Sequence, residues 1–140
     1  MNSIKNTDLE NFLNSINSGK LNLDDFWTLG DATSLSEETH GQRLEFHRGP
    51  LLYSLISYLK PKKILEFGTG GGYSTLCMAK ALDDNGIDSH IYTIDRVGND
   101  EKIDRFFKLP DDVSPQKKKI SNKEIWELTT KDSWRQKITL

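Results

Sequence analysis

The chain has 140 residues, which suits one compact domain, and its 19 basic and 21 acidic side chains give a formal net charge of −2. This balance gives no overall electrostatic preference for nucleic acid or for a membrane surface, so we expect neither as a partner. The single cysteine excludes an intramolecular disulfide framework, and the apolar runs are far shorter than the roughly 20 residues that span a bilayer, so a cytoplasmic setting is expected.

Residues 1–48 are expected to form a helical N-terminal segment. Apolar residues at helical spacing predict a short helix over residues 9–16. Residues 20–39 scatter their apolar side chains among Asp, Ser, Thr and Gly, which indicates a loop or short helical turns. Residues 37–46 are compatible with a further helix.

Residues 49–140 are expected to form the first half of a parallel α/β domain. Gly49 and Pro50 predict the start of a helix that Pro61 ends. The apolar face expected for this helix consists of Leu51, Leu52, Leu55, Ile56 and Leu59.

A strand, a glycine-rich turn, a helix and a second strand are predicted over residues 62–95. The apolar residues of the first strand, which are Ile64, Leu65 and Phe67, predict a strand buried in a parallel sheet. Ser74 is a candidate cap for the helix, whose expected core face consists of Leu76, Ala79 and Leu82. The second strand runs over residues 90–94 and closes on Asp95, which completes a βαβ unit.

The segment after this unit is more polar. A helix is predicted around residues 100–107, followed by a loop that includes Lys117, Lys118 and Lys119. Ser121 and Glu124 have the spacing of a capping box and predict another helix. Residues 137–140 resemble the opening of a third strand, at which the expected half-domain ends.

The run from Glu66 to Ser74 lies between the first predicted strand and its helix and carries the clearest chemical signal. Glycines in such a turn allow a ligand closer to the backbone than a Cβ atom would permit, and the helix start offers free N–H groups. Asp95, 27 residues after Gly68, is placed at a strand end where a carboxylate can accept hydrogen bonds from two ribose hydroxyls. This combination predicts a nucleoside site.

The spacing of the glycines distinguishes between nucleosides. A dinucleotide fingerprint needs a small residue at its sixth position, where this chain has Tyr73, and this disfavours NAD. A phosphate-binding P-loop is excluded because no Gly-Lys-Ser/Thr follows the glycines.

The acidic residue followed by Gly-x-Gly-x-Gly, here Glu66 through Gly72, resembles the first motif of the class I S-adenosylmethionine-dependent methyltransferases. The likeness is to catechol-type O-methyltransferases and to macrocin O-methyltransferase or cephalosporin hydroxylase-like relatives. It covers residues 49–96 and, more weakly, 121–140. The resemblance implies a partial Rossmann-like parallel sheet, S-adenosyl-L-methionine as cofactor, and methyl transfer to a small-molecule acceptor, with oxygen as the expected atom.

The resemblance also implies roles for individual residues. The turn glycines Gly68, Gly70 and Gly72 would lie under the methionine part of the cofactor, Glu66 would hold its amino end, and Asp95 would bind its ribose. Further cofactor contacts implied by position are Thr69, Tyr73 and Ser74.

The relatives have a seven-stranded sheet, and their catalytic and metal-binding residues follow the third strand, so the resemblance assigns no catalytic residue and no metal site. Without a fourth strand the first would be an exposed apolar edge. We therefore expect the N-terminal part of a methyltransferase, which either lacks its C-terminal half or self-associates. The alternative is a noncatalytic, methyltransferase-like binding module that pairs with another chain.

Overall fold

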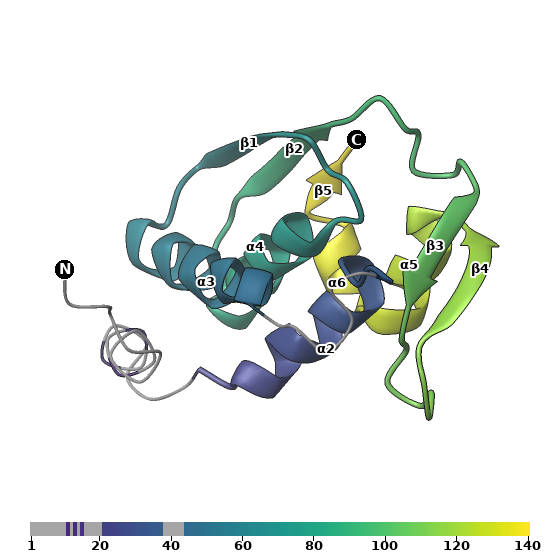
Figure 1. Ribbon diagram of the computed structural model, residues 1–140. Coiled ribbons are helices and arrows are strands. Elements are labelled where there is room, and N and C mark those ends of the chain that lie inside the picture. The colour runs from purple at the N-terminus through teal and green to yellow at the C-terminus, as the bar shows by residue number, and fades with distance from the viewer. Residues whose placement is uncertain (1–10, 12, 14, 16–20, 38–43) are drawn as a thin grey trace, which may run out of the picture.

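The computed structural model describes residues 11, 13, 15, 21–37 and 44–140 of the chain. These residues form a mixed α/β structure with a three-stranded parallel sheet, an antiparallel strand pair and several helices (Figure 1). The helix expected over residues 9–16 lies almost wholly outside the described residues. None of the helices in the described part is long and apolar enough to cross a membrane.

The parallel sheet has the order β1 (Lys63–Phe67), β2 (His90–Ile94) and β5 (Ile138–Thr139). All its pairings are parallel, with Leu65 opposite Tyr92 and Ile91 opposite Ile138. The three strands predicted from the sequence are therefore confirmed. Their carboxyl ends share one edge of the sheet, and this edge carries the glycine-rich turn.

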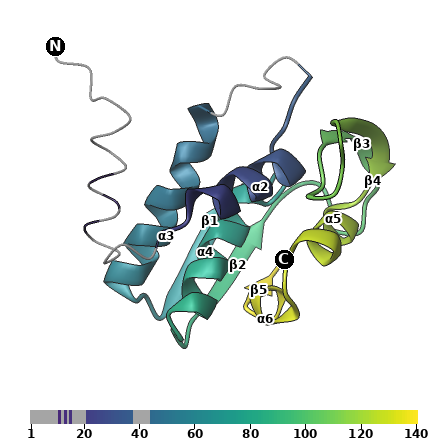
Figure 2. The same cartoon turned by 90° about the horizontal axis from the view of Figure 1, so that it is seen from below.

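Helix α4 (Tyr73–Asp84) lies against one face of the sheet and α3 (Arg48–Leu59) packs beside it (Figure 2). The core face predicted for α4 is confirmed, because Leu76, Ala79 and Leu82 are fully buried. The face predicted for α3 is wrong in part. Its buried residues are Gly49, Pro50, Tyr53, Ser54 and Ile56, whereas Leu51, Leu55 and Leu59 are exposed. These three leucines, four residues apart, form a stripe that points away from α4.

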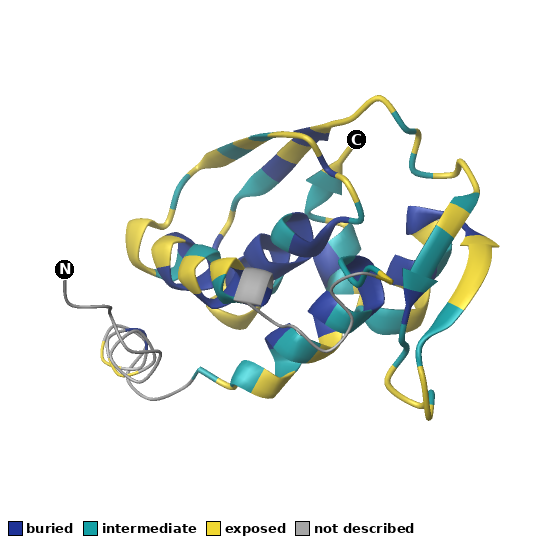
Figure 3. Ribbon diagram, in the orientation of Figure 1, coloured by how far each residue is buried: buried dark blue, intermediate teal, exposed yellow. Residues whose placement is uncertain are grey.

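The second face of the sheet carries no helix within the described residues. Its exposed side chains are Leu65 (59%), Phe67 (77%), Tyr92 (41%) and Ile94 (55%). Figure 3 shows the resulting alternation of exposed and less exposed residues along β1 and β2. The prediction of a buried first strand is thus wrong: Leu65 and Phe67 are exposed and Ile64 is only partly buried. Neighbouring side chains point to opposite faces, and within the described residues only one face is covered.

The structure places helix α2 (Leu23–Thr33) where a loop or short turns were predicted. The side chain of Asn22 caps it by accepting a hydrogen bond from the backbone N–H of Asp24 at 3.2 Å. Its buried residues include Phe26, Leu29 and Ala32, which are three apart and lie on one side of the helix. Of the helix suggested for residues 37–46, the described part forms only the start of a short 3₁₀ helix, η1 (Leu44–His47).

Two further expectations are wrong. The helix predicted around residues 100–107 is strand β3 (Ile103–Phe107), and the three lysines expected in a loop lie on β4 (Gln116–Ile120), its antiparallel partner. Side chains alternate between the two faces of a strand, so Ile103 and Phe107 lie on one face of β3, where Phe107 is buried.

The capping box is confirmed at the start of α5 (Asn122–Thr129), where Ser121 and Glu124 bond reciprocally. This helix buries Ile125 and Trp126, and the short helix α6 (Asp132–Arg135) buries Trp134. The hairpin, α5 and α6 together connect β2 to β5, and the hairpin lies next to α5 (Figure 1). Helix α5 reaches the glycine-rich turn, whereas α6 packs against the C-terminal end of α4.

Candidate functional site

The glycine turn, residues 68–72, joins the carboxyl end of β1 to the start of α4. The Gly68 N–H donates to the Ile94 carbonyl at 2.8 Å, which fixes the turn to the end of β2. The Gly72 N–H donates to the Thr69 carbonyl at 2.8 Å and closes the bend. Gly68, Gly70 and Gly72 have φ angles of 91°, 54° and 93°, in the left-handed region that other residues enter only with strain.

One side of the glycine turn is packed against distant parts of the chain. A Cβ atom at Gly71 would collide with the carbonyl of Thr33, and one at Gly72 would collide with the indole of Trp126. The Trp126 Nε1–H donates to the Gly71 carbonyl at 3.0 Å, and the Asn122 amide donates to the Gly70 carbonyl at 2.8 Å. We call this the braced side of the turn.

The other side of the turn is open. Among the described residues, apart from the sequence neighbours of each glycine, no heavy atom lies within 4 Å of the position that a Cβ would take at Gly68 or at Gly70, and both residues are exposed. A ligand can therefore approach the backbone here as closely as the sequence motif predicts. We call this the open side of the turn.

Asp95 follows the last residue of β2 and reaches the glycine turn. Its Oδ2 accepts a hydrogen bond from the Gly70 N–H at 2.7 Å. Its Oδ1 accepts from the backbone N–H of Arg96 at 2.6 Å and of Val97 at 3.2 Å. These bonds, the one from Gly70 foremost, hold the pKa of Asp95 below its usual value. The structure thus places an exposed, ionised carboxylate beside the open side of the turn.

Glu66 is the centre of a small hydroxyl network beneath the turn. Its Oε2 accepts from the hydroxyls of Thr75 at 2.5 Å and Thr93 at 2.7 Å. Thr69 shares a further hydrogen bond of 2.7 Å with Thr93, so the turn, α4 and β2 meet at this carboxylate. Both bonds go to the same oxygen of Glu66, which leaves its Oε1 to accept from a ligand.

The side chains of Tyr73 and Ser74 bond to other parts of the chain and not to the glycine turn. The Tyr73 side chain is buried in the core, where its hydroxyl donates to the Phe46 carbonyl at 2.6 Å. The Ser74 hydroxyl accepts from Nε of Arg48 at 3.3 Å. The prediction that Ser74 caps α4 is wrong, because the helix begins at Tyr73 and its cap is Gly72, which has no side chain to bond the first N–H groups.

Arg105 is a residue of the site that the sequence reasoning missed. It comes from β3, and its Nη1 lies 3.5 Å from the position of a Cβ at Gly71. Arg105 and Asp95 attract each other electrostatically. The sequence signal for Arg105 is its spacing: a charged residue stands two positions from each of Ile103 and Phe107, so in a strand it shares their apolar face.

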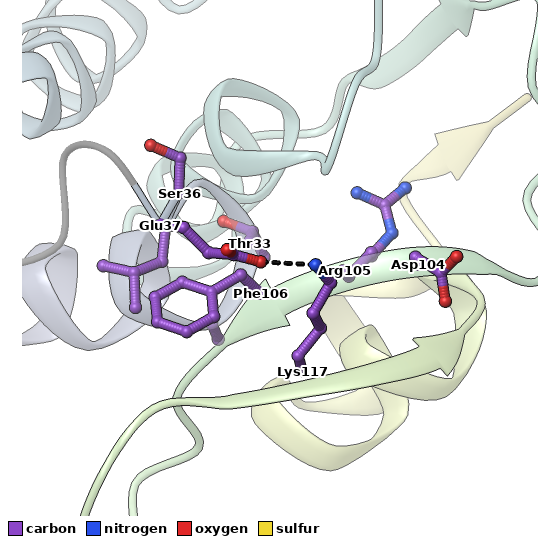
Figure 4. Close-up of a pocket in the computed structure, with 9 residues that line it drawn as sticks. Thr33, Ser36, Glu37, Asp104, Arg105, Phe106 and Lys117 are labelled. Carbon is purple, nitrogen blue, oxygen red and sulfur yellow. Dashed lines mark ion pairs between the residues drawn. The ribbon is translucent and has the colours of Figure 1, made fainter.

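Arg105 also lines a cavity of about 640 Å³ between the end of α2 and the hairpin (Figure 4). The other lining residues are Ala32, Thr33, Leu35, Ser36, Glu37, Asp104, Phe106 and Lys117. Lys117 and Glu37 form an ion pair of 2.6 Å across this cavity. Neither in this cavity nor in the rest of the described chain are three or more His, Cys, Asp or Glu side chains arranged to hold a metal ion.

No family model matches the sequence, and no curated protein matches it. The function of the chain has to be inferred from the geometry of the glycine turn and its neighbours.

Proposed function

We propose that this chain binds S-adenosylmethionine and forms the cofactor-binding part of a class I methyltransferase with a Rossmann-like sheet. The observation that carries the proposal is the position of the Asp95 carboxylate, 2.7 Å from the Gly70 N–H, at the carboxyl edge of parallel strands. Ligands of open α/β sheets bind at this edge, between the strand ends and the helix start. The open side of the glycine turn provides the space.

The residues present fit this cofactor. Asp95 is held by three backbone N–H groups, two on Oδ1 and one on Oδ2, so its Oδ2 keeps a lone pair for a ribose hydroxyl. The free Oε1 of Glu66 suits an amine, and the uncapped N–H groups at the start of α4 suit an electron-rich ligand. When bound, the cofactor supplies a methyl group on a sulfonium for transfer to a small-molecule acceptor, expected at oxygen. The chain's contribution is to hold that group in position.

Calorimetric titration of the 140-residue chain with S-adenosylhomocysteine tests the proposal. Gly70→Arg should weaken binding at least tenfold, because the long side chain fills the open side. Gly86→Arg is the matched control, since Gly86 has a φ of 59° against 54° at Gly70 and likewise has open space at its Cβ position in the described part of the chain. The proposal fails if the native chain gives no heat, or if the two variants bind alike. Binding of NADH in preference would instead favour a dinucleotide site.

A second pair of variants tests the carboxylate. Asp95→Asn should weaken S-adenosylhomocysteine binding about tenfold, because an amide keeps one acceptor oxygen and loses the charge. Asp112→Asn is the control, since Asp112 is a comparable carboxylate that accepts a backbone N–H from Leu109 at 2.8 Å away from the turn. Equal affinity of both variants would remove Asp95 from the site.

A noncatalytic module that binds another chain is the second candidate function. The observation that favours it is the exposed apolar sheet face next to β1, an edge strand with no further partner among the described residues, since such edges and apolar patches pair with other chains. Sedimentation velocity should then show concentration-dependent association that Leu65→Lys abolishes and Tyr58→Lys does not. Tyr58 is an exposed apolar residue of α3, away from the sheet. A monomer that binds S-adenosylhomocysteine would exclude this candidate.

A further inference from the structure

Arg105 occupies an unusual place for a charged side chain. Arg105 lies two residues from both Ile103 and Phe107 on β3, so its side chain is on the same face of the hairpin as theirs. Ile120 of β4, which pairs with Ile103, lies on this face too. Phe107 and Ile120 are almost fully buried there. A guanidinium on this face is partly removed from water, and this burial lowers its pKa.

Arg105 also lacks the partners that such a position normally demands. Its Nε is buried and has no hydrogen-bond partner, and no carboxylate of the described residues forms an ion pair with it. Asp95 attracts it from a distance, but that carboxylate already accepts from three backbone N–H groups. Lys117 and Lys102, which also lie near the hairpin, do have partners, Glu37 at 2.6 Å and Glu124 at 2.7 Å.

A second unsatisfied group lies at the same turn. Asn122 is 2% exposed, and its amide nitrogen donates to the Gly70 carbonyl, which fixes the orientation of the side chain. Its Oδ1 is buried and has no partner. Buried polar groups in folded proteins are nearly always hydrogen-bonded, so two exceptions beside one turn and one cavity point to a ligand.

We infer that Arg105 binds a carboxylate or phosphate group of a small-molecule ligand at the glycine turn. A guanidinium presents two parallel N–H donors to such a group, and the partly buried position strengthens the bond. The inference rests on the proposed function for placing a ligand at this turn. The acid has two sources there, the amino-acid carboxylate of the cofactor or an acidic group of the methyl acceptor.

Titration of the 140-residue chain with benzoate, and with benzamide as its uncharged isostere, tests the inference. The Nε–H resonance of Arg105 in ¹H–¹⁵N spectra reports binding at the residue itself. Benzoate should bind at least tenfold more tightly than benzamide, Arg105→Gln should remove this preference, and Arg105→Lys should restore part of it. Lys118→Gln is the control, because it removes an exposed charge directly opposite Arg105 in the hairpin and should keep the preference. Equal binding of the two probes by the native chain, or a preference that survives Arg105→Gln, overturns the inference.

A second arm distinguishes the two sources. S-adenosylhomocysteine carries the amino-acid carboxylate, and 5′-methylthioadenosine lacks it. If Arg105→Gln weakens the first at least tenfold and leaves the second within twofold, the acid belongs to the cofactor; if both are unchanged while the benzoate preference is lost, it belongs to the acceptor. If the native chain binds neither nucleoside, the proposed function fails, and the benzoate arm still decides the role of Arg105.

Discussion

The two sides of the glycine turn use the same residue type for different reasons. On the braced side, Gly71 and Gly72 are required because the carbonyl of Thr33 and the indole of Trp126 occupy the space of a side chain. On the open side, nothing in the described chain occupies that space at Gly68 or Gly70. The braced side therefore contributes to stability, whereas the open side is available for binding.

The largest expected effect is a difference in stability loss between alanine substitutions at two glycines with nearly equal φ angles, 93° at Gly72 and 91° at Gly68. Gly72→Ala should lower the free energy of unfolding by about 3 kcal/mol or more, because left-handed strain adds to a collision with Trp126. Gly68→Ala should cost about 1 kcal/mol from strain alone. Urea unfolding measures both values. Equal losses would mean that the two sides do not differ.

A smaller loss is expected when the bond between α5 and the turn is removed. Trp126→Phe leaves the Gly71 carbonyl without its donor and should cost about 1.5 kcal/mol. Trp134→Phe removes a bond from Nε1 to Asp83 at 3.1 Å and should cost about half as much, because Trp134 is less buried than Trp126 and water can replace the indole at a partly exposed carboxylate. The same urea series compares them, and a larger loss at Trp134 would contradict the bracing role of Trp126.

The open side should contribute a weaker, pH-dependent effect. The folded-state pKa of Asp95 lies below its unfolded value of about 3.9, so its stabilisation is present above that pH and is lost as the pH falls through the folded value. Asp95→Asn should flatten this part of the dependence of Tm on pH. Glu124→Gln is the comparison, since Lys102 first and then the capping box lower the pKa of Glu124 to about 2, and its contribution should disappear between about pH 4.5 and 2. If Asp95→Asn loses Tm at acidic pH as steeply as the native chain does, the hydrogen bond from the Gly70 N–H to Asp95 is not formed in solution.

The smallest change in stability is expected at Arg105. Arg105→Met keeps an unbranched side chain that reaches as far as Nε and removes an unpaired, partly buried charge, so stability should be unchanged or rise by up to about 1 kcal/mol. Lys118→Met, at an exposed position, should have no measurable effect. A loss of more than about 1 kcal/mol in Arg105→Met would make Arg105 a structural residue rather than a binding residue.

The elements with strong local signals were predicted well. The strand at β1, the turn, α4 and β2 lie where the apolar runs and the glycines indicated, and the Ser121 capping box starts α5. Helix α2 was missed because its apolar positions, among them Phe26 and Leu29, are mixed with residues that also favour turns. Strand β3 was missed because five residues fit either period, and its pairing with β4 decides the outcome.

The sequence by itself determined the cofactor hypothesis, because the spacing of Glu66, the glycines and Asp95 is a local pattern that one βαβ unit brings together. Tertiary structure alone decided which glycines are packed and which are open, since Thr33 and Trp126 come from elements far away in the chain. It also placed Arg105 at the turn and left the side chains of Leu65, Phe67, Tyr92 and Ile94 exposed on one face of the sheet. These features depend on contacts between distant segments, and the order of residues along the chain does not specify such contacts directly.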